Sequence, residues 1–263
     1  ILVAQGEYPH AEQLYRKTLA IERESLGDEH PEVITSLNNL AHVLQLRGDY
    51  RGAEALYREA LAIDRKQLGD EHPDVAIDLN NLAVVLAGQA RYSESEPLLR
   101  RVLAIWRSYL GDRHDQVALA LSNLADLLDM QGDYSGAEPL HREALAIRRS
   151  VFGNEHPEVA GSIARLAVVL RERGDLQEAE ALTREALEMR RRLLGDEPPK
   201  VSHSLSGLGL LLERQGDHAG ARRQYEEALE IRRNSYGHRH PFVAYSLSQI
   251  ARTLRAQGDF ELS

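Results

Sequence analysis

The sequence has 263 residues, of which 43% are hydrophobic and 28% charged, which suffices for one or two domains with a buried core. Its formal net charge of −9 argues against nucleic-acid binding, which normally requires a basic excess. The absence of cysteine excludes disulfides and thiolate metal sites, and it fits a reducing, cytoplasmic compartment. The longest apolar run, residues 82–87, is far shorter than the roughly 20 residues of a membrane span, so we expect no membrane insertion.

Two short motifs recur every 42 residues along the chain. The first is Gly-Asp-Tyr at residues 48–50, and its related copies start at residues 6, 90, 132, 174, 216 and 258. The second is Leu-Gly-Asp-Glu-His-Pro at residues 26–31 and 68–73, with related copies that start at residues 110, 152, 194 and 236. Because both ladders share one phase over the whole chain, the sequence is an array of repeats.

Between the two motifs lie two apolar patterns of helical period, which predict a shorter helix A and a longer helix B in each repeat. Glycine after a helix and proline at its first position are typical of helix ends, and both recur at the motifs. In chain order, helix B is expected near residues 9–25, 51–67, 93–109, 135–151, 177–193 and 219–235. Helix A is expected near residues 32–46, 74–88, 116–130, 158–172, 200–214 and 242–256.

The order of these residues resembles a known family. A small residue, Gly-Asp-Tyr, Ala, Tyr and Ala-Leu follow one another as in the tetratricopeptide repeat, here with a 42-residue period. Residues 68–76, followed by Leu-Asn-Asn-Leu-Ala at 79–83, resemble the kinesin light chain type of repeat. The resemblance covers essentially the whole chain. It implies an all-α fold, a right-handed superhelical solenoid of antiparallel helix hairpins, as a single domain over residues 1–263.

Two further features concern the origin of the chain. Only three of the 32 basic residues are lysines, a bias that indicates a GC-rich, bacterial gene. Residue 1 aligns with the interior of a helix A and residue 263 with the start of a helix B, so both ends cut through a repeat. We therefore expect a fragment of a longer protein.

No pattern in the sequence indicates catalysis or a cofactor. Five histidines occupy the slot immediately before helix A, where we expect them to cap the helix: His30, His72, His114, His156 and His240. Equivalent slots of successive repeats should lie roughly 10 Å apart, too far for the converging ligands of a metal site. The pair His238 and His240 is the weaker alternative, a metal site. Because catalytic motifs such as G-x-S-x-G and H-E-x-x-H are absent, we expect no enzyme and no cofactor.

In arrays of this family helix A lines the concave side, so its residues outside the apolar core are expected to face a groove. We call this set the groove line. It comprises Thr35, Asn38, His42, Gln45, Ile77, Asn80, Val84, Ala87, Leu119, Ser122, Asp126, Asp129, Gly161, Ala164, Val168, Arg171, His203, Ser206, Leu210, Glu213, Tyr245, Ser248, Arg252 and Arg255.

The ligand-binding residues that we predict lie on or beside the groove line. Asparagine is a poor helix former, and its amide can both donate to and accept from a peptide backbone; the alternative is that it bonds a neighbouring repeat. Charge along the line passes from neutral to acidic to basic, which favours a ligand with acidic residues toward the C-terminal repeats. The predicted residues are Asn38, His42, Asn80, Asn81, Ser122, Asn123, Asp126, Asp129, Arg165, Arg171, Arg214, Tyr245, Arg252 and Arg255.

These features favour a protein–protein interaction scaffold that binds an extended peptide or partner segment in the groove, with neither nucleic acid nor membrane as partner. One alternative is a regulatory sensor or autoinhibitory array in a larger signalling protein, where it would control an attached ATPase or protease. Another is a structural role, in which the repeat ends pair into a homo-oligomer.

Overall fold

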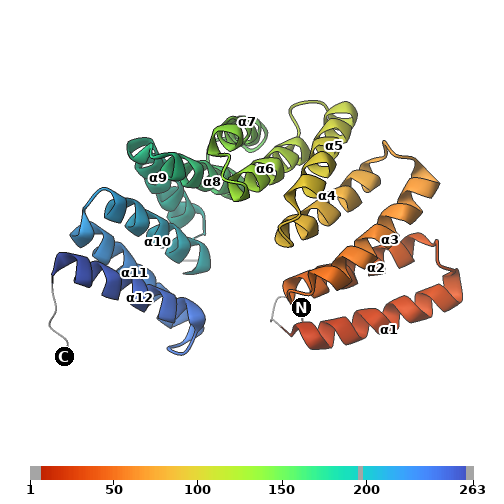
Figure 1. The fold of residues 1–263 in the computed structure, drawn as a ribbon, viewed down its shortest axis with the longest axis horizontal. Coiled ribbons are helices and arrows are strands. Elements are labelled where there is room, and N and C mark those ends of the chain that lie inside the picture. The colour runs from red at the N-terminus through yellow and green to blue at the C-terminus, as the bar shows by residue number, and fades with distance from the viewer. Residues whose placement is uncertain (1–6, 195–197, 259–263) are drawn as a thin grey trace. The chain divides into compact units, whose positions relative to one another are not determined.

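The structure is a computed structural model that describes residues 7–194 and 198–258, and the regular elements of these residues are all α-helices. Helix B of the repeats corresponds to α1 (Tyr8–Leu26), α3 (Tyr50–Leu68), α5 (Tyr92–Leu110), α7 (Tyr134–Phe152), α9 (Leu176–Leu194) and α11 (His218–Tyr236) (Figure 1). Helix A corresponds to α2 (Pro31–Leu46), α4 (Pro73–Gly88), α6 (Asp115–Met130), α8 (Pro157–Arg173), α10 (Pro198–Arg214) and α12 (Pro241–Gln257). Each bound lies within two residues of the range expected from the sequence.

The histidine before helix A caps that helix, as the sequence predicts. In α2, the Nδ1 atom of His30 accepts a hydrogen bond of 3.2 Å from the backbone N–H of Glu32. The same bond, with the same length, is made at four further helices by His72, His114, His156 and His240. Because the first N–H groups of a helix have no partner within the helix, these bonds satisfy donors that would otherwise be lost. The histidine ladder therefore has a structural role.

The turn from helix A to helix B needs a left-handed residue, which glycine provides at most repeats. Gly48 has φ 83° in this turn, and the following Asp49 accepts a hydrogen bond of 2.9 Å from the N–H of Gly52. Ala90 fills the slot of Gly48 in the next repeat and adopts φ 59°. Because a Cβ atom crowds the left-handed conformation, Ala90 carries backbone strain that the glycines avoid.

Small residues let helix A and helix B approach closely. Ala41, Ala83 and Ala125 are fully buried at one slot of helix A, as the sequence pattern indicates. Gly209 occupies that slot in α10, where an added Cβ would lie only 2.6 Å from Cε1 of Tyr225 on α11. The aromatic ring of Tyr225 therefore fills the space that an alanine occupies in the other repeats.

The helices group into two compact units, unit 1 (Ile1–Gln131) and unit 2 (Gly132–Ser263). Within each unit, helices adjacent in sequence pack against each other as hairpins, and consecutive hairpins stack. The resulting core consists mainly of leucine, alanine, valine and isoleucine, in line with the low aromatic content, and Tyr57, Trp106 and Tyr225 are its buried aromatic residues among those described. In the part of the chain that the structure describes, no helix is long and apolar enough to cross a membrane. That one solenoid runs through both units stays a prediction.

Candidate functional site

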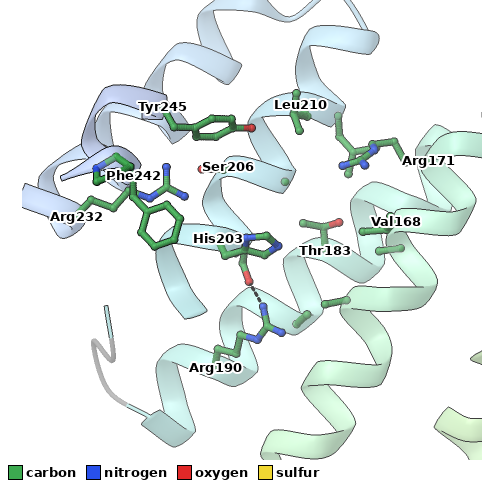
Figure 2. Close-up of a pocket in the computed structure, with 17 residues that line it drawn as sticks. Val168, Arg171, Thr183, Arg190, His203, Ser206, Leu210, Arg232, Phe242 and Tyr245 are labelled. Carbon is green, nitrogen blue, oxygen red and sulfur yellow. Dashed lines mark hydrogen bonds between the residues drawn. The ribbon is translucent and has the colours of Figure 1, made fainter. Parts of the chain in front are cut away.

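In unit 2, the groove line opens into a cavity of about 510 Å³. Seven groove-line residues line it: Ala164, Val168, Arg171, His203, Ser206, Leu210 and Tyr245. They come from α8, α10 and α12, and the cavity continues between these helices to α9 and α11 (Figure 2). The volume lies within the range of small-molecule sites, about 300–1,000 Å³. The groove line of unit 2 is thus the rim of a deep pocket.

Small and apolar side chains form most of the cavity wall. Ala167 and Leu211 contribute from helix A, Ala186 contributes from helix B, and Phe242 lines the cavity on α12. Gly207 lines it as well, and an added Cβ at this residue would meet no atom within 4 Å. The space beside Gly207 is therefore open.

Two arginines of helix B, Arg190 on α9 and Arg232 on α11, also line the cavity, and Figure 2 shows Arg232 beside Phe242. Arg232 is only 4% exposed, and its Nη1 donates a hydrogen bond of 2.6 Å to Oγ of Ser246. Its guanidinium carbon lies 5.5 Å from the ring centre of Tyr245 and 5.9 Å from that of Phe242, within the range of cation–π attraction.

Arg190 repeats the contact of Arg232 one repeat earlier. Its Nη1 donates a hydrogen bond of 2.5 Å to Oγ of Ser204. Burial lowers the pKa of both arginines, because it removes water from the charged form. Partial burial also lowers the pKa of His203, and the nearby Arg190, Arg232 and Arg171 lower it further, although its ring is exposed at the cavity mouth.

The sequence analysis missed these two arginines, although a ladder marks them. At intervals of 42 residues, one slot of helix B carries Glu22, Asp64, Trp106, Arg148, Arg190 and Arg232 in succession. The groove line contains only residues of helix A, whereas this slot lies on helix B. The same comparison on helix B would have shown two acidic residues in unit 1 and three arginines in unit 2.

In unit 1, a cavity of about 360 Å³ also lies on the groove line, with Thr35, Asn38 and Ile77 among its lining residues. The ladder slot contributes Asp64, which is buried beside the buried Asp78 of α4. Burial raises the pKa of Asp78 to about 7, and the negative charge of Asp64 acts in the same direction. At neutral pH and below, this pair therefore tends to hold one proton.

The predicted asparagines make hydrogen bonds between repeats. Nδ2 of Asn38 donates a bond of 2.8 Å to Oδ1 of Asp78, and Nδ2 of Asn123 donates one of 2.7 Å to Oδ1 of Asn80. Oδ1 of Asn38 is buried and accepts no hydrogen bond within the described residues. The alternative that these asparagines bond a neighbouring repeat is therefore confirmed, whereas a role in ligand binding stays a prediction.

The remaining predicted residues occupy different environments. The hydroxyl of Ser122 is buried and donates a bond of 2.9 Å to the carbonyl of Ala118 in its own helix. Three residues are half-buried, namely Asn81, Asp126 and Asp129. Four are exposed, namely His42, Arg165, Tyr245 and Arg255.

Glutamates of unit 2 neutralise two arginines of the groove line, Arg171 and Arg252, and the neighbouring Arg214. Nη2 of Arg171 lies 2.8 Å from Oε1 of Glu172, whose Oε2 accepts a bond of 2.7 Å from Arg214. Arg252 is paired with Glu213. These pairs offset much of the basic end of the charge gradient that the sequence indicates. By contrast, no carboxylate of the described residues forms an ion pair with Arg190 or Arg232.

No group of three histidine, aspartate or glutamate side chains in the described ranges has a geometry that could hold a metal ion. Possible ligands such as His238 and His240 lie at one end of α12, where His240 caps the helix.

Comparison with known proteins places this geometry in a family. The family model described as Tetratricopeptide repeat matches the chain six times, at residues 1–66, 38–105, 74–150, 132–192, 158–234 and 200–263. These matches together span the whole sequence. No curated protein matches the chain significantly.

Several solved structures have the same fold. BtubC (BKLC) from P. vanneervenii is 24% identical, with a TM-score of 0.69 over 90% of this chain and 92% of that chain. A putative kinesin light chain with nearly identical TPR-like repeats from Podosopora anserina is 26% identical, with a TM-score of 0.66 over 79% of this chain and 98% of that one. A Rap protein, solved in complex with Competence and Sporulation Factor, is 15% identical, with a TM-score of 0.66 over 98% and 73% of the two chains.

Proposed function

Since the chain belongs to the tetratricopeptide repeat family, whose repeats generally mediate protein–protein interaction, we propose that it is an interaction scaffold that binds a partner segment along the groove line. One observation carries this proposal. In each unit a cavity lies on the groove line, with Thr35, Asn38 and Ile77 in unit 1 and seven residues of the line in unit 2. The positions that the repeat pattern assigns to the groove thus border hollows that side chains of a partner can enter.

Exposed apolar side chains on helix A support the same surface. Ile77 is 46% exposed, and Val84 and Tyr245 are also exposed on the groove line. An apolar residue that faces water gains free energy when a partner covers it, at roughly 25 cal/mol for each Å² buried. The polar neighbours Asn38 and Asn80 would then give such a partner its orientation.

A selected peptide tests this proposal in unit 1. We would select binders from a random peptide library on the intact protein and measure their affinity for a variant with Ile77→Glu and Val84→Glu. Both substitutions place a charge on the exposed face of α4, so binding should weaken about tenfold or more, since 1.4 kcal/mol corresponds to a factor of ten. Peptides that bind in unit 2 are tested in the same way with Tyr245→Glu.

The matched control is Tyr109→Glu on α5, a helix B. Tyr109 is 67% exposed and lies outside the groove line, so this variant should bind the peptides as the unsubstituted protein does. Thermal unfolding of all variants shows whether they remain folded. If Tyr109→Glu weakens binding while the groove-line variants do not, the proposed surface is wrong.

A further inference from the structure

We propose that the cavity of unit 2 is a site for a small organic monocarboxylate, which places its carboxylate on Arg190 and Arg232 and its apolar body against the cavity wall (Figure 2). This inference goes beyond the proposed interaction with a protein segment, because it assigns a different class of ligand. It rests on Arg190 and Arg232, which helix B contributes to the cavity.

The first step is the positive charge of Arg190 and Arg232, which no carboxylate of the described residues balances. Arg190 and Arg232 line the cavity, and they donate hydrogen bonds to neutral oxygens, namely serine hydroxyls and backbone carbonyls. A buried cation without a counterion is costly, and buried charges are normally paired. Arg232 is buried and Arg190 is half-buried, and among the described residues neither guanidinium has such a partner, so the site can take an anion that the protein itself does not supply.

The second step is the repeat in which the counterion is present. Arg148 occupies the same slot in α7, and its Nη2 lies 3.4 Å from Oε2 of Glu158 on α8. The slot of Glu158 holds Lys200 in the next repeat and Phe242 in the last. The arginine ladder thus continues where the acidic ladder stops, and a ligand carboxylate would take the place of the missing glutamate.

The third step is the shape and polarity of the remaining space. Alanines, leucines and Gly207 form the wall, and the open space beside Gly207 would hold several carbon atoms. Guanidinium groups bind planar carboxylates through parallel N–H bonds, and Phe242 and Tyr245 add apolar area at the mouth. A charged head on an apolar body matches this arrangement, whereas a fully polar anion would leave the wall uncovered.

The experiment is a calorimetric titration of the intact protein with octanoate and 4-phenylbutyrate. Acetate supplies the charge without the apolar body, and 1-octanol supplies the apolar body without the charge. We expect octanoate or 4-phenylbutyrate to bind about tenfold more tightly than acetate or 1-octanol, because a hydrogen-bonded charge and a buried chain each contribute a factor of this order.

Two pairs of variants locate the site. Gly207→Leu fills the cavity without a clash at Cβ, and Gly161→Leu makes the same change on α8 outside the cavity, where a Cβ also meets nothing within 4 Å. Phe242→Glu restores the acidic ladder beside Arg232, and Phe242→Gln removes the ring without adding a charge. Gly207→Leu should weaken binding about tenfold or more, whereas Gly161→Leu should change it by less than about threefold. Phe242→Gln removes apolar area of the wall and should weaken binding moderately, and Phe242→Glu should weaken it about tenfold more than Phe242→Gln does. Substitution of Arg232 itself is avoided, because it would remove buried hydrogen bonds of the core.

The outcomes separate this proposal from the proposed interaction function. If neither carboxylate binds at millimolar concentration, or if Gly161→Leu weakens binding as much as Gly207→Leu, the small-acid site does not exist. If the carboxylates fail to bind while selected peptides still bind along the groove line, the scaffold function stands and only the small-acid site is overturned. Thermal unfolding of each variant confirms that lost binding does not reflect lost folding.

Discussion

Asp78 shows how one buried side chain makes the stability of unit 1 depend on pH. It is only 1% exposed, and burial together with Asp64 raises its pKa to about 7, whereas an aspartate of an unfolded chain has a pKa near 3.9. Between about pH 4 and pH 7 the folded state therefore binds more protons than the unfolded state. By linkage, the contribution of Asp78 is fully present below pH 4 and is lost as the pH rises toward 7.

Asp78→Asn tests this dependence. An amide keeps the acceptor for Asn38 and can donate to Asp64, but it cannot ionise. We would measure the free energy of unfolding by chemical denaturation. At pH 8 the value for the variant should be higher than that of the unsubstituted protein by on the order of 2–4 kcal/mol, and the difference should vanish near pH 4. Carboxylates with a lowered pKa, such as Glu54, change the stability with pH in the opposite direction. Both proteins contain them, so their contribution cancels when the two free energies of unfolding are subtracted. A difference that does not change with pH would contradict the account.

Ala90 gives a second prediction at the scale of one residue. Its φ of 59° is left-handed, a conformation that costs an L-residue about 1–2 kcal/mol. Ala90→Gly should therefore stabilise the protein by about 1 kcal/mol in urea denaturation. Gly48→Ala makes the reverse change in the equivalent turn, at φ 83°, and should destabilise it by a similar amount. If both substitutions changed the stability in the same direction, the strain assigned to Ala90 would be contradicted.

At the scale of elements, α10 contains two glycines whose replacement by alanine should change the stability in opposite directions. A Cβ at Gly209 would lie 2.6 Å from Cε1 of Tyr225, whereas one at Gly207 would meet no atom within 4 Å. Gly209→Ala should push α10 and α11 apart and destabilise the protein by about 1–3 kcal/mol. Gly207→Ala gains helix propensity and should stabilise it by up to about 1 kcal/mol. Thermal or urea unfolding of the two variants decides whether the close approach of Tyr225 explains Gly209.

The helices were the part of the structure that the sequence predicted best. Six copies of each pattern define every end, so the bounds follow from motifs such as Pro31 and Gly69. The capping role of His30 and its equivalents followed from their slot before the helix. These features depend on local chemistry, and local chemistry repeats with the sequence.

Contacts between side chains of different repeats were predicted less well. The sequence placed Asn38 on the groove line but could not tell whether its amide would reach Asp78 in the next helix A. It placed Arg252 in a basic stretch, although Glu213 pairs with it. Arg171 of the unit 2 cavity was predicted, whereas Arg190 and Arg232 were missed because they lie on helix B and the predicted groove residues were taken from helix A. Such pairings depend on distances between helices, which a repeat period does not supply.

At the scale of the whole molecule, the repeats explain the stability and underlie the proposed function. One hairpin buries only one side of each helix, so its stability depends on the hairpins stacked against it. Within each unit the same stacking repeats the helix A positions, and in the proposed function the groove line of that unit is a series of related but unequal subsites. Substitution within one slot, such as Asp64 in unit 1 and Arg232 in unit 2, changes the chemistry of a subsite without changing the fold.

The most direct measurement of the central claim is site-specific photocrosslinking to a selected peptide. A photoreactive residue replaces exposed helix A residues, His42, Val84 or Tyr245, in one set of variants, and exposed helix B residues, Ile21, Tyr109 or Val151, in a second set. The account predicts covalent adducts with the peptide from at least one helix A variant and none from the helix B variants. Adducts from helix B variants alone, or equal yields from both sets, would contradict it.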